Sequence, residues 1–396
     1  MKRSSPWNHQ GLRVTGALAL ACTLIVPLSH RYAANAAGAV YEIGAVVSES
    51  GPGSSLGRPE ADSIQMAIDE INKAGGVGGR QLHATIIDDE SNPTTAVNAV
   101  RKLLDQKVVA LLGPSLTQTT LAVVPLATQA QVPMISLASS AQVIEPVSER
   151  KWIFKMPITD THIAMTIQSY LKKQKTMKIA VIYRDDDYGK TGLSHFEQAG
   201  KAAGFDVVDS EAIAANATDA TTQLTHIKAA NPQAVVVWTT LPTAAVVVKA
   251  YRELNVPYPL YYSDGAATGV FLQQAGDALN GAYIASLKIN VADSLPNGDP
   301  QKKLLRHYID SFDAMFPKDA PVSIFGGFGY DSVYVLKAAL DKAGSGDENK
   351  VRDALEHVTY TGASGTFHMS ASDHNGLSGD ATVLTRIEAQ KFTVAK

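Results

Sequence analysis

The chain of 396 residues is predicted to be an α/β protein with two doubly wound parallel sheets, and three observations support this class. From Tyr41 onward, short β-rich apolar runs alternate with longer stretches of helical periodicity, which is typical of parallel α/β sheets. Two such series of similar size follow one another, which indicates two sheets. After an apolar leader roughly 360 residues remain, and a chain of that length usually divides into two domains.

The first series starts with a strand at residues 41–48 and a loop rich in glycine and serine at 51–57. Pro59 suits the first turn of the next helix, where the missing amide hydrogen costs no hydrogen bond. Asn92 and Pro93 mark another helix start, because asparagine caps free amide groups and proline fits the first helical position. The remaining elements expected in this series are strand 81–88, helix 93–106, strand 108–112, helix 117–130 and strand 133–136.

The second series continues the same alternation. Its expected helices are 159–173, 188–203, 219–230 and 243–254, and its expected strands are 178–183, 206–208 and 234–239. Beyond residue 287, helical segments at 299–315, 325–343 and 348–357 precede an irregular tail with short strands at 366–369 and 381–387.

Residues 1–36 have the features of a secretory signal peptide. A basic start precedes an apolar run at 14–28, and small residues at 34–36 fit a cleavage site. Because the run is too short to span a bilayer permanently, we expect a mature protein that begins near Ala37 and works outside the cytoplasm. The only cysteine, Cys22, lies in this leader, so the mature chain is expected to be stabilised without disulfides. Lipidation of Cys22 is the less favoured alternative, since the apolar run continues past it.

The composition and motifs argue against several classes of function. A net charge of −3 and a charged fraction of 18% provide no basic stripe for nucleic acid. Gly189-Lys190-Thr191 ends like a phosphate-binding loop, but Arg184 stands where that loop needs its first glycine. The chain has no His-Glu-x-x-His motif, and after the leader it has no cysteine for a zinc ribbon. We therefore expect no catalysis, no cofactor and no metal centre.

Acidic clusters and two histidines are interpreted as surface features. Residues 88–90 and 185–187 follow apolar strands, where exposed carboxylates commonly cap helices. A hard cation bound at either cluster is the less favoured alternative. His368 and His374 lie in the polar tail and are expected on the surface rather than as metal ligands.

Two strand ends carry stronger signs of ligand binding, because open parallel sheets bind ligands beyond the carboxyl ends of their strands. Residues 113–117 end a buried strand and open a helix, so their amide groups and the Thr117 hydroxyl could hold a carboxylate at the positive helix end. An equally weighted alternative is that Thr117 only caps the helix. Residues 135–140 bring further hydroxyl groups to the same edge.

A set of motifs extends over most of the mature chain. They are Gly51-Pro52, Ala67 to Arg80 with Asp69-Glu70-Ile71-Asn72 and Gly75-Gly76 inside it, Asp88-Asp89, Gly113-Pro114, Pro133 to Ser136, Asp187-Tyr188-Gly189 and Ala275-Gly276-Asp277. Together they resemble the branched-chain amino-acid (Leu/Ile/Val) binding proteins of bacterial ABC importers. The resemblance implies a type I periplasmic binding fold, in which two α/β lobes joined by three crossovers close over a small ligand. Lobe one would comprise 37–156 plus 287–362, and lobe two 157–286 plus 363–396.

The resemblance also implies a set of ligand-binding residues. They are Leu56, Ser115, Leu116, Thr117, Ala138, Ser139, Ser140, Tyr188, Asp264 and Phe325. Thr117 and the region of Ser140 match positions that bind the ligand carboxylate, and the Ala138 carbonyl matches an acceptor for an ammonium group. Asp264 matches the acidic residue that pairs with the α-ammonium, although a turn aspartate is the alternative interpretation.

The side-chain half of the pocket differs from close family members. Tyr188 and Phe325 match aromatic walls, but Leu56 and residues 241–242 stand where relatives place aromatic residues. We therefore expect a periplasmic protein that delivers an aliphatic or branched-chain amino acid to a membrane permease. Two alternatives remain: a binder of an aromatic or other non-amino carboxylate, amide or urea, and a ligand sensor of the same fold.

Overall fold

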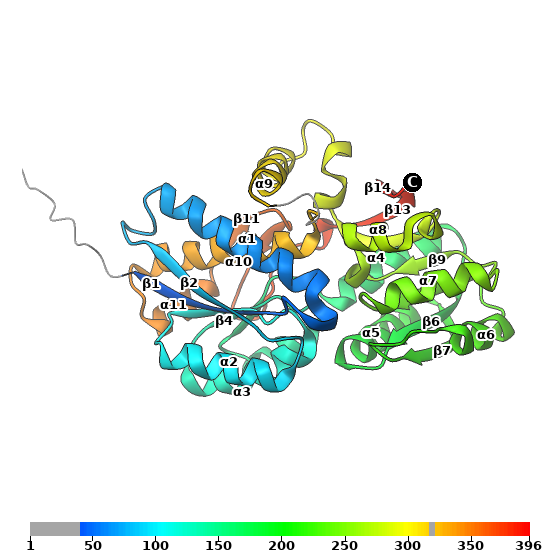
Figure 1. Ribbon diagram of the computed structural model, residues 1–396, viewed down its shortest axis with the longest axis horizontal. Coiled ribbons are helices and arrows are strands. Elements are labelled where there is room, and N and C mark those ends of the chain that lie inside the picture. The colour runs from blue at the N-terminus through cyan, green and yellow to red at the C-terminus, as the bar shows by residue number, and fades with distance from the viewer. Residues whose placement is uncertain (1–39, 317–320) are drawn as a thin grey trace, which may run out of the picture. The chain divides into compact units, whose positions relative to one another are not determined.

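The computed structural model describes residues 40–316 and 321–396. The predicted signal peptide at 1–36, which includes Cys22, lies outside these residues, as does the expected mature start at Ala37. Within the described part, the chain forms two large sheets of mainly parallel strands and a small two-stranded sheet (Figure 1). The predicted α/β class with two parallel sheets is confirmed.

The first sheet has five parallel strands in the order β2-β1-β3-β4-β5. These are β1 (Tyr41–Val47), β2 (Leu82–Asp88), β3 (Ala110–Leu112), β4 (Met134–Ser136) and β5 (Ile153–Lys155). Helices α1 (Ser54–Lys73) and α10 (Ile324–Ala343) pack together on one face, and α2 (Pro93–Asp105) and α3 (Thr117–Ala130) pack together on the other (Figure 1). Because helices cover both faces, β1 is apolar and buried along nearly its whole length.

The second sheet has seven strands in the order β14-β13-β10-β9-β8-β6-β7. The parallel strands are β6 (Lys178–Arg184), β7 (Asp206–Ile213), β8 (Ala234–Trp238), β9 (Leu260–Tyr262) and β10 (Tyr283–Leu287), and the antiparallel ones are β13 (Thr382–Glu388) and β14 (Lys391–Val394). α4 (Asp160–Lys173) precedes β6, and the helices that follow between the parallel strands are α5 (Asp187–Ala203), α6 (Thr221–Ala230), α7 (Thr243–Glu253) and α8 (Gly269–Ala275). α4 packs against α5, and α7 against α8.

The C-terminal third adds the helix α10 to one face of the first sheet and strands to the second sheet. α9 (Lys302–Met315) precedes α10, and α11 (Glu348–Leu355) packs against α10. β11 (Thr359–Thr361) pairs with β12 (Thr366–His368), and the chain then returns to the second sheet at β13. Strand membership thus places the passages between sheets after β5, after β10 and before β13; the division into lobes at residues 156, 286 and 362 stays a prediction. None of the helices in the described ranges combines the length and apolar character needed to cross a membrane.

The start of α1 differs from the expectation. A 3₁₀ turn at Gly51–Gly53 leads directly into a helix that begins at Ser54, so Pro59 lies inside the helix rather than in its first turn. The glycines in this segment serve close packing: a Cβ on Gly57 would lie 2.2 Å from the Ser48 carbonyl oxygen at the end of β1. Because a glycine-rich stretch can mean a loop or a close contact, the sequence pattern alone misplaced this boundary.

Two residues expected at the surface are buried. His374 is fully buried, stacks on Phe154 with ring centroids 4.2 Å apart, and has its Nδ1 2.8 Å from the Ile153 carbonyl oxygen. Asp89 is also fully buried, and it accepts a hydrogen bond of 2.6 Å from the Ser48 hydroxyl. Both expectations were wrong because the contacts come from distant segments, which local polarity does not reveal. His368 is exposed, as predicted.

The tail is tied to β5 by a buried asparagine. The Asn375 side-chain amide donates to the carbonyl oxygens of Lys155 and Pro157, both at 3.0 Å. Asn375 is only 3% exposed, so water cannot replace these hydrogen bonds.

Asn375→Ala is therefore expected to lower the free energy of unfolding by about 1–3 kcal/mol, since it removes the side-chain hydrogen bond to the buried Lys155 carbonyl and one of the two side-chain hydrogen bonds to the Pro157 carbonyl. Urea denaturation of the mature protein measures this change. Ser372→Ala, at an exposed position of the same loop, is the control and should shift the free energy by less than about 0.5 kcal/mol. Equal stability of Asn375→Ala and wild type would contradict the anchoring role.

Candidate functional site

A small inner cavity lies where the carboxyl ends of strands from both sheets meet. Its volume is about 20 Å³, which is room for about one water molecule. The residues that line it are Leu56, Ser115, Leu116, Thr117, Leu137, Ser139, Arg184, Tyr188, Thr240, Gly265 and Phe325. The structure therefore brings together Leu56, Ser115, Leu116, Thr117, Ser139, Tyr188 and Phe325 of the predicted set, while Ala138, Ser140 and Asp264 lie outside the lining.

The connection from β3 to α3 forms one wall. Gly113 has a φ of +88°, and a Cβ there would lie 1.9 Å from the Val46 carbonyl oxygen, so only glycine fits this turn. The N-cap residue of α3 is Leu116, whose side chain cannot cap the helix, and Thr117 is the first helical residue. The alternative that Thr117 caps the helix is therefore wrong. The start of α3 presents amide groups without a side-chain cap, which favours an anion there.

Ser115 is held by groups behind the wall. Its Oγ accepts a hydrogen bond of 3.0 Å from the Ser48 amide and also hydrogen-bonds to the Glu60 carboxyl group on α1. Glu60 is fully buried, and this burial raises the pKa of its carboxyl group well above the usual range. The sequence offered no sign of this contact, because Glu60 lies on the helix that was expected to be only amphipathic.

Asp264 lies just behind the opposite wall, in the short 3₁₀ turn Asp264–Ala266 that follows β9. Its carboxylate accepts hydrogen bonds of 2.9 Å from both Ser139 Oγ and Tyr188 Oη. Burial raises the pKa of this carboxyl group, while the hydrogen bonds from Ser139 and Tyr188 lower it. Gly265 must be small, since a Cβ there would lie 2.7 Å from Tyr188 Oη.

A buried lysine that the sequence analysis missed supports the Ser139 backbone. Lys155, on β5, donates from Nζ to the carbonyl oxygens of Ser139 at 2.8 Å and Pro157 at 2.6 Å. Burial lowers the pKa of Lys155 to about 8, against the opposing effect of the Asp160 and Asp264 charges. A lysine inside an apolar strand was the available signal, because a buried cation needs such partners.

The two neighbours of Ser139 face other surroundings. Ala138 is buried, and its amide donates to Ser136 Oγ at 3.1 Å. Ser140 donates from its hydroxyl to Thr191 Oγ1 on α5 at 3.2 Å. The Ser139–Asp264 and Ser140–Thr191 hydrogen bonds thus both join the segment after β4 to elements of the second sheet.

Arg184 and Thr240 complete the wall from the second sheet, and both were missed. The Arg184 side chain is 4% exposed, and its Nε lies 2.6 Å from Asp186 Oδ2. Its Nη1 donates to Thr240 Oγ1, and its guanidinium group lies 5.4 Å from the centre of the Tyr188 ring. An arginine at the end of an apolar strand was the signal, but Arg184 was not among the predicted ligand-binding residues.

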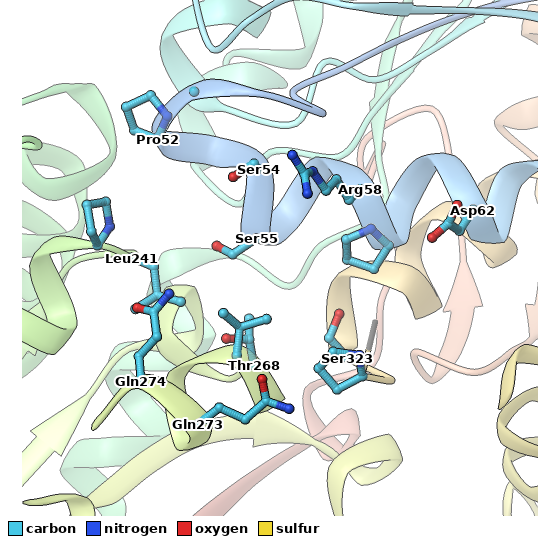
Figure 2. A pocket seen from close by; sticks show the side chains of 15 residues that line it. Pro52, Ser54, Ser55, Arg58, Asp62, Leu241, Thr268, Gln273, Gln274 and Ser323 are labelled. Carbon is cyan, nitrogen blue, oxygen red and sulfur yellow. The ribbon is translucent and has the colours of Figure 1, made fainter. Parts of the chain in front are cut away.

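A second, outer cavity of about 690 Å³ lies beside the inner one. Figure 2 shows Ser54, Ser55 and Arg58 of α1 across the cavity from Thr268 and Gln274. Residues 53–57 have the spacing Gly-x-Ser-x-Gly found at some hydrolase nucleophiles. However, Ser55 lies in the first turn of α1, and its hydroxyl has no hydrogen-bond partner among the described residues. No described cluster of three or more His, Cys, Asp or Glu side chains could hold a metal ion.

Comparisons with known proteins agree with this architecture. A Leu/Ile/Val-binding protein of Rhizobium johnstonii is 23% identical over 97% of this chain and its own full length. A leucine-, isoleucine-, valine-, threonine- and alanine-binding protein of Pseudomonas aeruginosa is 26% identical over 78% of this chain and 80% of its own.

Solved structures extend the likeness to three dimensions. An extracellular ligand-binding receptor of Rhodopseudomonas palustris is 28% identical, with a TM-score of 0.83 over 90% of this chain and all of its own. The branched-chain amino-acid binding protein LivJ of Streptococcus pneumoniae, solved with isoleucine, is 25% identical, with a TM-score of 0.79 over 90% of this chain and 98% of its own. The family model described as periplasmic binding protein matches residues 40–390. The chain therefore belongs to the periplasmic binding protein family, whose members bind solutes outside the cytoplasm rather than catalyse reactions.

Proposed function

We propose that this protein binds a small amino acid, most favourably an aliphatic or branched-chain one, and delivers it to an ABC permease in the membrane. The observation that carries the ligand class is the buried Asp264 carboxylate beside the inner cavity, opposite the uncapped start of α3. One group suits an ammonium ion and the other a carboxylate, as an α-amino acid requires. The names of the curated relatives and of the LivJ structure support the same class.

Each end of the ligand then has a defined partner. The carboxylate binds the amides at the start of α3 with the Ser115 and Thr117 hydroxyls, and the ammonium group pairs with Asp264. Burial of a zwitterion removes its hydration, so several charge-assisted hydrogen bonds must replace it. At about 1.5–3 kcal/mol each, three or four such bonds supply much of the roughly −8 kcal/mol that micromolar binding needs. Leu56, Leu116 and Phe325 offer apolar contacts to the ligand side chain.

Ligand uptake requires movement, because the inner cavity has room for only about one water molecule. The two walls come from different sheets, and Ser139–Asp264 and Ser140–Thr191 join them. When the two walls separate, the site opens. A ligand that contacts both walls favours the closed arrangement. The permease recognises the closed form, and residues 1–36 direct the chain to the periplasm as a cleavable signal peptide.

A non-amino carboxylate remains the second candidate for a specific reason. Asp264 already accepts two hydrogen bonds within the protein, and Arg184 adds a cation to the wall. Comparing ligands that differ only in the ammonium group separates the two candidates.

Leucine is expected to raise the melting temperature of refolded, ligand-free mature protein more than the same concentration of 4-methylpentanoate does. At a hundred times its dissociation constant, leucine adds about 2.7 kcal/mol of stability. A thermal-shift assay with both compounds measures the difference. Stabilisation by 4-methylpentanoate alone would assign the pocket to organic acids and give Asp264 a structural role.

Asp264→Asn is expected to weaken leucine binding by about ten- to a hundredfold, because it removes a charge-assisted interaction with the ammonium group. Titration calorimetry gives the dissociation constants. Asp277→Asn, at an exposed turn, is the matched control and should bind leucine like the wild type. Unchanged leucine affinity in Asp264→Asn rules out the ammonium pairing.

Thr117→Ala is expected to weaken leucine and 4-methylpentanoate by the same factor, about tenfold, since both carry the carboxylate that this hydroxyl would bind. Competition binding against whichever compound binds more tightly gives the dissociation constants of both ligands for mutant and wild type. The ratio of mutant to wild-type constants is the factor by which each ligand is weakened. Thr94→Ala, exposed near the start of α2, is the control. A loss for leucine but not for 4-methylpentanoate would place Thr117 at another part of the ligand.

A further inference from the structure

A buried carboxyl group stands behind the proposed carboxylate site. Glu60 Oε2 hydrogen-bonds to Ser115 Oγ, and Ser115 lines the inner cavity. Glu60 Oε1 is buried and has no hydrogen-bond partner among the described residues. An ionised carboxylate in this position would be desolvated with half of its acceptor capacity unmet, which is costly.

None of the described residues around Glu60 adds a positive charge. The end of β1 presents Ser48, and the connection from β2 to α2 presents Asp89, whose negative charge opposes ionisation of Glu60. The backbone of α10 packs closely on α1 here, since a Cβ on Gly329 would lie 2.6 Å from the Glu60 carbonyl oxygen. Burial, the largest effect, raises the pKa of Glu60 well above its usual range, and Asp89 adds to the shift. Both effects favour a neutral, protonated carboxyl group.

The protonation of Glu60 decides what Ser115 can donate. A serine hydroxyl has one donor proton and two acceptor sites, and the Ser48 amide occupies one acceptor site. If Glu60 is ionised, the Ser115 proton is committed to Glu60. If Glu60 is protonated, its O–H donates to the second acceptor site of Ser115, and the Ser115 proton is free for a ligand.

We propose that Glu60 is a positioning residue for the ligand carboxylate: in its protonated form it donates to Ser115 Oγ and thereby directs the Ser115 hydroxyl proton to that carboxylate. The inference rests on the proposed function only in requiring a ligand carboxylate at Ser115; it requires no ammonium group. Because a bound carboxylate adds negative charge near Glu60, binding favours the proton on Glu60. Ligand affinity should therefore be highest at pH values below the pKa of Glu60 in the free protein. It should fall as the pH rises through that pKa.

The test compares wild type, Glu60→Gln and Glu60→Leu by titration calorimetry with leucine and with 4-methylpentanoate, from about pH 6 to pH 9. Wild-type affinity should fall by up to about tenfold per pH unit once Glu60 ionises, with proton uptake on binding. Glu60→Gln should stay within about threefold of the low-pH wild-type affinity without this dependence, because its amide donates to Ser115 as the protonated carboxyl does. Glu60→Leu should lose about ten- to a hundredfold for both ligands.

The matched control is Glu70→Gln, on the same helix, where the carboxylate accepts hydrogen bonds from Tyr330 and Tyr334 instead. It should retain the wild-type pH profile. Since Asp264 also titrates, the difference between wild type and Glu60→Gln isolates the effect of Glu60 for both ligands, and 4-methylpentanoate lacks the ammonium group that would pair with Asp264. Identical pH profiles of wild type and Glu60→Gln, or equal losses in Glu60→Gln and Glu60→Leu, overturn the proposal.

A ligand-free measurement keeps this proposal separate from the ligand assignment. The infrared carbonyl stretch of a protonated carboxyl group should be present in the wild type at neutral pH and absent in Glu60→Gln. Affinity should fall at the pH where this band disappears. A wild type without the band, or a band lost with no change in affinity, overturns the role of Glu60. Binding of 4-methylpentanoate but not leucine refutes only the amino-acid assignment.

Discussion

The carboxylate of Asp264 holds the two walls of the site together. It accepts one hydrogen bond from Ser139, after β4 of the first sheet, and one from Tyr188, on α5 beside the second sheet. Lys155 in turn holds the Ser139 carbonyl, and Asn375 holds the Lys155 carbonyl. This chain of contacts extends from the tail of the protein through β5 to the second sheet, so the shape of the inner cavity depends on distant parts of the sequence.

Charge is distributed unevenly around the cavity. Behind the first-sheet wall, Glu60 and Asp89 are buried, and no cation in the described part of the chain faces either carboxyl group. At the second-sheet wall, Arg184 is paired with Asp186 and packs over Tyr188. Because burial penalises each isolated charge, the first wall favours neutral hydroxyl and amide donors, while the second tolerates paired ions. That contrast suits a ligand whose anionic end meets hydrogen-bond donors and whose cationic end meets a carboxylate.

Most of the fold was predictable from local pattern. Alternating apolar runs and helical stretches located the strands and helices of both sheets, because covered parallel strands are apolar throughout and their helices are amphipathic. Boundaries failed where one residue type has two uses: Gly57 is part of α1 because it allows the helix to contact Ser48, although its sequence context suggested a loop. Seven predicted site residues meet at the inner cavity because strand ends and helix starts converge there.

The sequence by itself determined the fold class and the polar strand ends that meet at the inner cavity, because periodicity and turn chemistry are local properties. Only the tertiary structure decided that His374 and Asp89 are buried, that Glu60 stands behind Ser115, and that Arg184 and Thr240 belong to the wall. These contacts join residues far apart in the chain, and their hydrogen bonds and desolvation arise only when the segments pack. Residue type alone therefore cannot distinguish a surface carboxylate from a buried one.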